Sequence, residues 1–108
     1  MKFKLIKQES NKADFSSIQG VVDATRDELV DVFGEPHPVE FIDGKITTEW
    51  ILEFEDGTIA TIYDWKRGEL GAPSGDEVYE WHIGGHQRRA LENVQAAWKA
   101  ANNVTIPL

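Results

Sequence analysis

The sequence predicts an α+β fold in which an antiparallel β-sheet of about five strands is covered by two helices. Three observations predict it: apolar residues that alternate with polar ones, an Asp56-Gly57 dipeptide between two alternating segments, and two segments with helical periodicity. The expected order is β-β-α-β-β-β-α, and strands in runs are typical of α+β proteins. A length of 108 residues fits a single domain, residues 1–108, with one hydrophobic core.

Two strands and a helix are expected in the first third of the chain. Residues 2–7 alternate apolar side chains with lysines, and residues 18–24 are rich in β-branched side chains. Thr25, with Glu28 three positions later, predicts a capping box at the start of a helix. Gly34, which is followed two residues later by a proline, predicts the end of that helix.

A β-hairpin is expected in the middle of the chain. Residues 45–55 and 58–65 form alternating segments on either side of Asp56-Gly57, a dipeptide favoured in two-residue type I′ turns. Such a turn places Trp50, Leu52 and Phe54 on one face, opposite Tyr63, Thr61 and Ile59. The other face then holds Glu49, Ile51, Glu53, Ala60, Ile62 and Asp64.

A loop, a strand and a helix are expected in the last third. Residues 66–77 contain three glycines and a proline, which indicates a loop. Residues 78–83 alternate again and predict the last strand. From about residue 86 to residue 102, an apolar stripe that includes Leu91 and Trp98 predicts the final helix.

The composition limits the classes of function. Eleven Lys and Arg against nineteen Asp and Glu give a formal net charge of −8, which repels phosphate backbones, so we expect no direct nucleic-acid binding. The absence of cysteine excludes disulfides and thiolate metal sites. Without a long apolar run or a signal-peptide pattern, we expect no membrane segment and a cytoplasmic location.

Basic residues gather where the last helix is expected to begin. His86, Arg88 and Arg89 lie there, directly after Gly84 and Gly85. The amino end of a helix carries partial positive charge, so acidic residues are favoured there and basic ones are not. A bound anion would compensate this arrangement. The alternative is that the arginines pair with carboxylates elsewhere in this acidic chain.

Aromatic residues lie beside cations at the end of the hairpin. Tyr63 and Trp65 precede Lys66 and Arg67, and an aromatic side chain beside a cation is suited to stacking a nucleobase. The alternative is that these aromatic side chains belong to the core. The residues predicted to bind a ligand are Tyr63, Trp65, Lys66, Arg67, His82, Gly84, Gly85, His86, Arg88 and Arg89.

Catalysis and metal binding are not expected. The spacing of His37, His82 and His86 matches no common metal-ligand pattern, and His37 lies between prolines like an ordinary loop residue. Ser74 lacks the sequence context of a nucleophile elbow. We therefore predict a protein that is not an enzyme, with no metal, no cofactor and no catalytic residues.

Several segments resemble a family of small, mostly uncharacterised proteins of tailed bacteriophages. The segments are Phe33–Pro36, Trp50–Thr58, Ala60–Lys66 and Trp81–His86. The resemblance implies a viral protein that acts in the cytoplasm of a bacterial host, and it assigns no catalytic residues. Phages use many small acidic proteins against host defence, which makes a counter-defence role the expectation.

Two functions fit these observations. In the first, the basic and aromatic residues sequester a nucleotide or similar anionic ligand of host defence. In the second, the protein is an acidic inhibitor of a host defence protein, similar to anti-CRISPR proteins, and covers its nucleic-acid site. The surface for that partner would consist of Asp27, Glu28, Asp31, Glu49, Glu53 and Glu55.

A homodimer is a further expectation. The hairpin register described above leaves Ile51, Ala60 and Ile62 on the second face of the sheet. Two helices are too few to cover both faces of such a sheet, and an apolar sheet face needs cover. We therefore expect this face to pair with a second copy of the chain.

Overall fold

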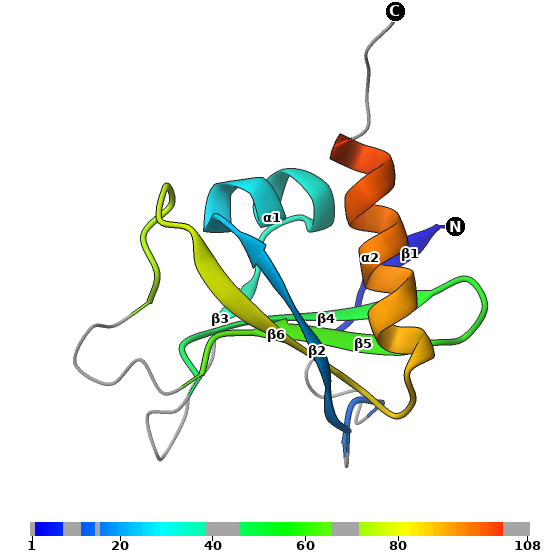
Figure 1. Cartoon of the computed structure of the whole chain (residues 1–108). Helices are drawn as coiled ribbons and strands as arrows, with labels where there is room; N and C mark the ends of the chain where they lie inside the picture. Colours follow the sequence, from blue (N-terminus) through cyan, green and yellow to red (C-terminus); the bar gives the residue numbers. More distant parts are fainter. Residues whose placement is uncertain (1, 8–11, 15, 39–45, 66–71, 103–108) are drawn as a thin grey trace, which may run out of the picture.

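The sheet and the two helices form as the sequence predicts (Figure 1). The computed structural model describes residues 2–7, 12–14, 16–38, 46–65 and 72–102. The elements in chain order are β1 (Phe3–Leu5), β2 (Ser17–Ala24), α1 (Arg26–Phe33), β3 (His37–Pro38), β4 (Thr48–Phe54), β5 (Ile59–Tyr63), β6 (Tyr79–Gly85) and α2 (Arg89–Asn102). Antiparallel pairing gives the strand order β1-β4-β5-β6-β2, and the two-residue β3 also pairs with β4.

Both helices cover the same face of the sheet (Figure 1), and the core lies between these two layers. Trp50 and Trp81 are fully buried at its centre, with ring centroids 5.4 Å apart in an edge-to-face arrangement. Their indole N–H groups donate to the carbonyl oxygens of Gly34 at 2.7 Å and Ala24 at 3.0 Å. A buried indole N–H without an acceptor would be costly, so these two bonds hold each ring in a defined position.

Helix α1 begins and ends where the sequence predicts. The Thr25 hydroxyl accepts from the Glu28 backbone N–H at 3.1 Å, and the Glu28 carboxylate accepts from the Thr25 N–H at 2.8 Å. This confirms the capping box. Gly34 ends the helix with a φ of 93°, a conformation in which glycine has no Cβ to strain.

The hairpin joins β4 and β5 as predicted, but its register is shifted by one residue. The Gly57 N–H donates to the Phe54 carbonyl at 2.8 Å, and Gly57 has a φ of 87°. The Phe54 N–H donates to the Thr58 carbonyl at 2.9 Å, so the loop contains three residues instead of two. A type I turn followed by a left-handed glycine is the usual geometry of such a loop.

This shift reverses the faces of β5, because side chains alternate along a strand. Leu52 now lies opposite Ala60, and Trp50 lies opposite Ile62. Ala60 and Ile62 are fully buried in the core beneath the helices, and their predicted place on the second face is wrong. Of the three apolar residues on which the predicted homodimer depended, only Ile51 remains on the second face, which is turned away from the helices, so the homodimer stays a prediction with less support.

The boundary between β6 and α2 also differs from the prediction. Strand β6 continues through Gly84 and Gly85, and α2 begins at Arg89 instead of at about residue 86. Helix α2 then runs to Asn102 as expected. In the described part of the chain, neither helix has both the length and the apolar character that crossing a membrane requires.

Candidate functional site

Three of the predicted ligand-binding residues meet at the end of β5. Trp65 stacks on His82, with ring centroids 6.2 Å apart and an angle of 27° between the planes. Tyr63 meets both rings edge-on, at 5.5 Å from His82 and 6.3 Å from Trp65. Trp65 is 37% exposed. We call these three side chains the aromatic cluster.

The cluster is positioned by strand pairing and by a tyrosine hydroxyl. Tyr63 lies directly opposite His82 in the pairing of β5 with β6, which places both side chains on the second face of the sheet. Just beyond β5, the Tyr79 hydroxyl accepts from the Trp65 N–H at 3.0 Å and lies 3.3 Å from the Trp65 carbonyl oxygen. These contacts fix the backbone from which the Trp65 ring projects.

Asp64 anchors the same segment from inside the protein. Its carboxylate is fully buried and accepts from the backbone N–H groups of Thr47 at 2.7 Å and Thr48 at 3.0 Å. The Thr47 hydroxyl donates to its other oxygen. The sequence analysis placed Asp64 on the second face of the sheet and did not include it among the predicted site residues. The sequence does show a carboxylate directly after an apolar strand. It does not show which groups bind this carboxylate, because the donors lie sixteen and seventeen residues earlier in the chain.

Two further residues flank the cluster. Glu49 lies opposite Tyr63 on β4, and Val21, which is 40% exposed, lies opposite His82 on β2. Burial, together with the negative charge of Glu49, raises the pKa of Tyr63 above its ordinary value of 10.0. Sequence reasoning missed Val21 as part of this surface, because β2 and β6 pair across a long separation in the chain.

The basic residues of the predicted site do not all join the aromatic cluster. Lys66 and Arg67 lie outside the described residues. His86, Arg88 and Arg89 follow the carboxyl end of β6, whereas His82 lies in the middle of that strand. The four residues of extended chain from His82 to His86 span about 13 Å. The sequence therefore predicted one site, whereas the fold separates the aromatic cluster, at the middle of β6, from the basic residues that follow β6.

The amino end of α2 is partly neutralised by the protein itself. The Arg89 guanidinium lies 3.9 Å from the Asp56 carboxylate, to which Asn93 also donates at 3.1 and 3.3 Å. Hydrogen bonds from Thr58, then the Asn93 bond and the Arg89 charge, lower the pKa of Asp56 below 3.8. His86 Nε2 lies 2.7 Å from the carbonyl oxygen of Lys12. Internal pairing, the alternative interpretation of these residues, therefore accounts for Arg89.

Gly84 and Gly85, which the sequence analysis included among the ligand-binding residues, serve the packing of β6. Both are buried in β6. An added Cβ at Gly85 would lie 2.3 Å from the Ala90 Cβ, and one at Gly84 would lie 2.6 Å from the Thr61 hydroxyl oxygen. Only glycine allows the last strand to approach α2 and β5 this closely.

The residues predicted for an acidic partner surface do not form one surface. Asp27, Glu28 and Asp31 belong to α1, in the helical layer. Glu49 and Glu53 alternate with the core residues of β4 and so lie on the other side of the sheet, and Glu55 lies in the hairpin loop. Several of these carboxylates also have internal partners. Glu53 bonds Lys12 at 3.0 Å, Glu28 caps α1, and Glu55 accepts from the Lys2 backbone N–H.

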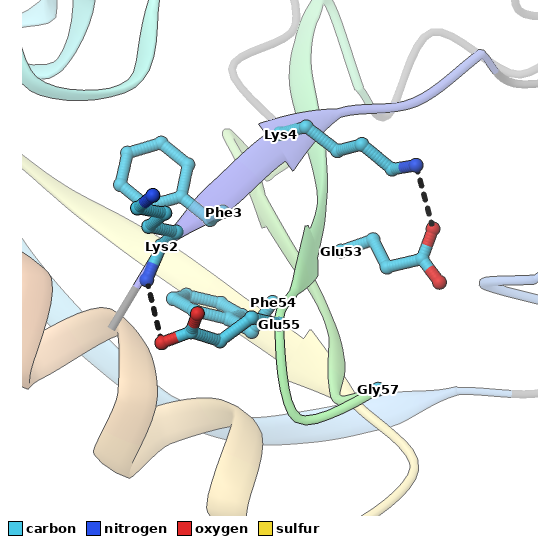
Figure 2. Close-up of a pocket in the computed structure, with 7 residues that line it drawn as sticks. All are labelled: Lys2, Phe3, Lys4, Glu53, Phe54, Glu55 and Gly57. Carbon is cyan, nitrogen blue, oxygen red and sulfur yellow. Dashed lines mark hydrogen bonds and ion pairs between the residues drawn. The ribbon is translucent and has the colours of Figure 1, made fainter.

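A hollow of about 380 Å³ lies beside β1 and the end of β4 (Figure 2). Phe3 and Phe54 contribute tilted rings 5.6 Å apart. Lys4 forms an ion pair with Glu53 along it, at 3.9 Å, and the Glu55 carboxylate accepts a hydrogen bond from the Lys2 backbone N–H. Nothing in this hollow points to a particular ligand.

Among the described residues, no three His, Asp or Glu side chains come together as a metal site requires. His82 lies in the aromatic cluster, His86 precedes α2, and His37 lies on β3. Comparisons of the chain with protein-family models, with curated proteins and with solved structures find no match.

Proposed function

We propose that this protein is a non-enzymatic binding protein that takes up a nucleotide, or a similar planar ligand with a phosphate group, at the aromatic cluster. The observation that carries the proposal is the stacked pair of Trp65 and His82, with Tyr63 against both rings. Trp65 is more than a third exposed while its backbone is held at both N–H and carbonyl. A rigid, accessible indole loses little conformational entropy when a ligand binds.

Stacking supplies the attraction for the planar part of the ligand. A base that stacks on an aromatic side chain gains about 1–3 kcal/mol, and every base has a face that can stack. Val21 extends the apolar surface next to His82. The cluster thus favours a flat heterocycle.

Two cations next to Trp65 in the sequence supply the attraction for the phosphate. Lys66 and Arg67 follow Trp65 directly in the chain, and an arginine fork matches the geometry of a phosphate group. The net charge of −8 opposes a long polyanion along the whole surface, whereas a small anion needs only a local pair of cations. This proposal does not use His86, Arg88 and Arg89, which lie beyond the far end of β6.

The resemblance to bacteriophage proteins suggests the setting. In an infected bacterium, a protein that holds a nucleotide signal of host defence would lower its free concentration without any chemical step. The binding step is what the aromatic cluster supports, and the counter-defence role rests on the resemblance.

Isothermal titration calorimetry of the full chain tests the proposal. The titrants are AMP, ADP, cyclic AMP, adenosine and inorganic phosphate. We expect saturable heat with at least one nucleotide, weaker binding of adenosine, and a loss of about tenfold or more in affinity for Trp65→Leu because stacking is removed. Trp65→Phe should recover part of that affinity.

Arg88→Gln is the matched control, because Arg88 is exposed and lies at the other end of β6. It should bind like the unchanged protein. Absence of heat with every nucleotide, or equal affinity of Trp65→Leu and the unchanged protein, would overturn the proposal.

A further inference from the structure

A second pocket, of about 420 Å³, lies at the end of the sheet where α1 begins. It is separate from the hollow in Figure 2 and from the aromatic cluster, with which it shares no lining residue. Its lining comes from four segments that are distant in the sequence. They include Arg26, His37, Thr47, Thr48 and Gly75.

His37 brings a buried nitrogen without a partner to this pocket. The sequence analysis treated it as an ordinary loop residue, whereas the structure places it on β3 opposite Glu49. Its Nε2 atom is buried and makes no hydrogen bond. Buried polar atoms almost always have a partner, so an unpartnered nitrogen beside a cavity calls for an explanation, and a bound acceptor is one.

Arg26 brings a positive charge to the same pocket. It is half-buried, and in the described part of the chain no carboxylate lies within ion-pairing distance of its guanidinium. Asp64, which binds Thr47 and Thr48, already accepts three hydrogen bonds from them. A half-buried guanidinium has five N–H donors, and it favours an anionic partner.

Two backbone N–H groups at the start of α1 already have acceptors within the protein. The Glu28 N–H donates to the Thr25 hydroxyl, and the Asp27 N–H donates to the Gly75 carbonyl at 3.1 Å. The Asp27 carboxylate lies against Gly75, where an added Cβ would approach it to 2.6 Å. Among the side chains that line the pocket, Arg26 and His37 carry nitrogen atoms that make no hydrogen bond or ion pair with the described residues.

We propose that this pocket binds a small oxyanion, a carboxylate or phosphate group, between the Arg26 guanidinium and the Nε2–H group of His37. The anion would give the orphaned imidazole nitrogen an acceptor and would balance the charge of Arg26. This site goes beyond the proposed nucleotide function and does not depend on it.

Nuclear magnetic resonance of the full chain, with ¹⁵N labels in the histidine and arginine side chains, tests the proposal. The probes are inorganic phosphate and acetate, added at constant ionic strength against sodium chloride. We expect saturable shifts of the His37 ring and the Arg26 Nε–H signals with one common dissociation constant, at concentrations up to about 50 mM. A response to phosphate alone or to acetate alone identifies which oxyanion the pocket prefers.

Variants separate this site from general charge effects and from the aromatic cluster. Arg26→Gln should weaken binding by about tenfold or more, because the charge-assisted hydrogen bonds are lost, and Arg26→Lys should recover part of it. Arg88→Gln, which removes an exposed arginine elsewhere, and Trp65→Leu should both bind the probe as the unchanged protein does.

Two results would overturn the proposal. One is that neither phosphate nor acetate produces saturable shifts of the His37 and Arg26 signals in the unchanged protein, a result that does not depend on whether any variant folds. The other is an equal loss of affinity in Arg26→Gln and Arg88→Gln, which would show a general charge effect. Loss of nucleotide binding in Trp65→Leu with unchanged phosphate binding would show that the two sites are independent.

Discussion

Removal of the Asp64 carboxylate should destabilise the protein strongly. Asp64 is fully buried beyond the end of β5 and accepts hydrogen bonds from two backbone N–H groups and one hydroxyl. In Asp64→Ala these donors lose their acceptor. The Thr48 N–H bond is buried, whereas the Thr47 N–H bond is only partly buried, so water can replace the acceptor more easily at Thr47.

The expected loss in free energy of unfolding depends on how deeply each of these donors is buried. A buried donor left without a partner costs about 1–3 kcal/mol, and bonds to a charged acceptor lie at the upper end of the range. We therefore expect Asp64→Ala to lower the free energy of unfolding by about 3 kcal/mol. Asp64→Asn keeps an oxygen for both N–H groups and should lose only about 1 kcal/mol. A small domain has only ~5–15 kcal/mol in total.

Urea unfolding followed by tryptophan fluorescence measures both changes. With a slope of about 1.5 kcal/mol per M, Asp64→Ala should lower the urea midpoint by about 2 M. Asp31→Asn, an exposed aspartate on α1, is the control and should stay within about 0.5 kcal/mol of the unchanged protein. If Asp64→Ala differs from Asp31→Asn by less than about 1 kcal/mol, the anchoring role of Asp64 is wrong.

Further predictions concern the hairpin, the last strand and the two shifted pKa values. Gly57→Ala should cost about 1 kcal/mol in urea unfolding, because φ is 87° and an added Cβ meets nothing else, and Gly57→Asn should cost less. Gly85→Ala should cost more than Gly57→Ala, because its Cβ would lie 2.3 Å from the side chain of α2; equal losses would contradict the packing described. The lowered pKa of Asp56 favours its charged form in the folded protein, so its contribution to stability is present above about pH 4 and is lost as the pH falls. When the pH is lowered from about 5 to about 3, the urea midpoint should therefore fall less in Asp56→Asn than in the unchanged protein. The raised pKa of Tyr63 can be measured from the absorbance at 295 nm, as the difference between the unchanged protein and Tyr63→Phe, and this difference should titrate above pH 10.0. Glu49→Gln should lower the pKa of Tyr63, because a negative charge is removed. A titration at or below pH 10.0 would contradict the burial of the hydroxyl.

The fold class was predictable because its signals are local. The capping box of Thr25 and Glu28 needs only a spacing of three residues, and alternation is visible within each strand. The hairpin register was not predictable from Asp56-Gly57 alone, because the same dipeptide fits a two-residue loop and a three-residue loop. A difference of one residue then moved Ala60 and Ile62 from the second face into the core.

The candidate site was predictable only in part, because it depends on pairing between distant segments. Tyr63 and Trp65 are close in sequence, and the pairing of β5 with β6 brings His82 to them. No local pattern shows that Asp56 lies beside Arg89, or that His37 lies near Arg26. The basic residues before α2 were interpreted as an anion site because of their place at the start of a helix. The structure shows that the Asp56 carboxylate, in the hairpin loop, lies beside one of them, Arg89.

Proton magnetic resonance of AMP mixed with the full chain tests most directly whether a base stacks on Trp65. The indole ring current should move the adenine H2 and H8 signals upfield in a saturable way, and the movement should vanish in Trp65→Leu while Arg88→Gln retains it. Adenine signals that stay in place, or that move equally with Trp65→Leu, would contradict a ligand site at the aromatic cluster.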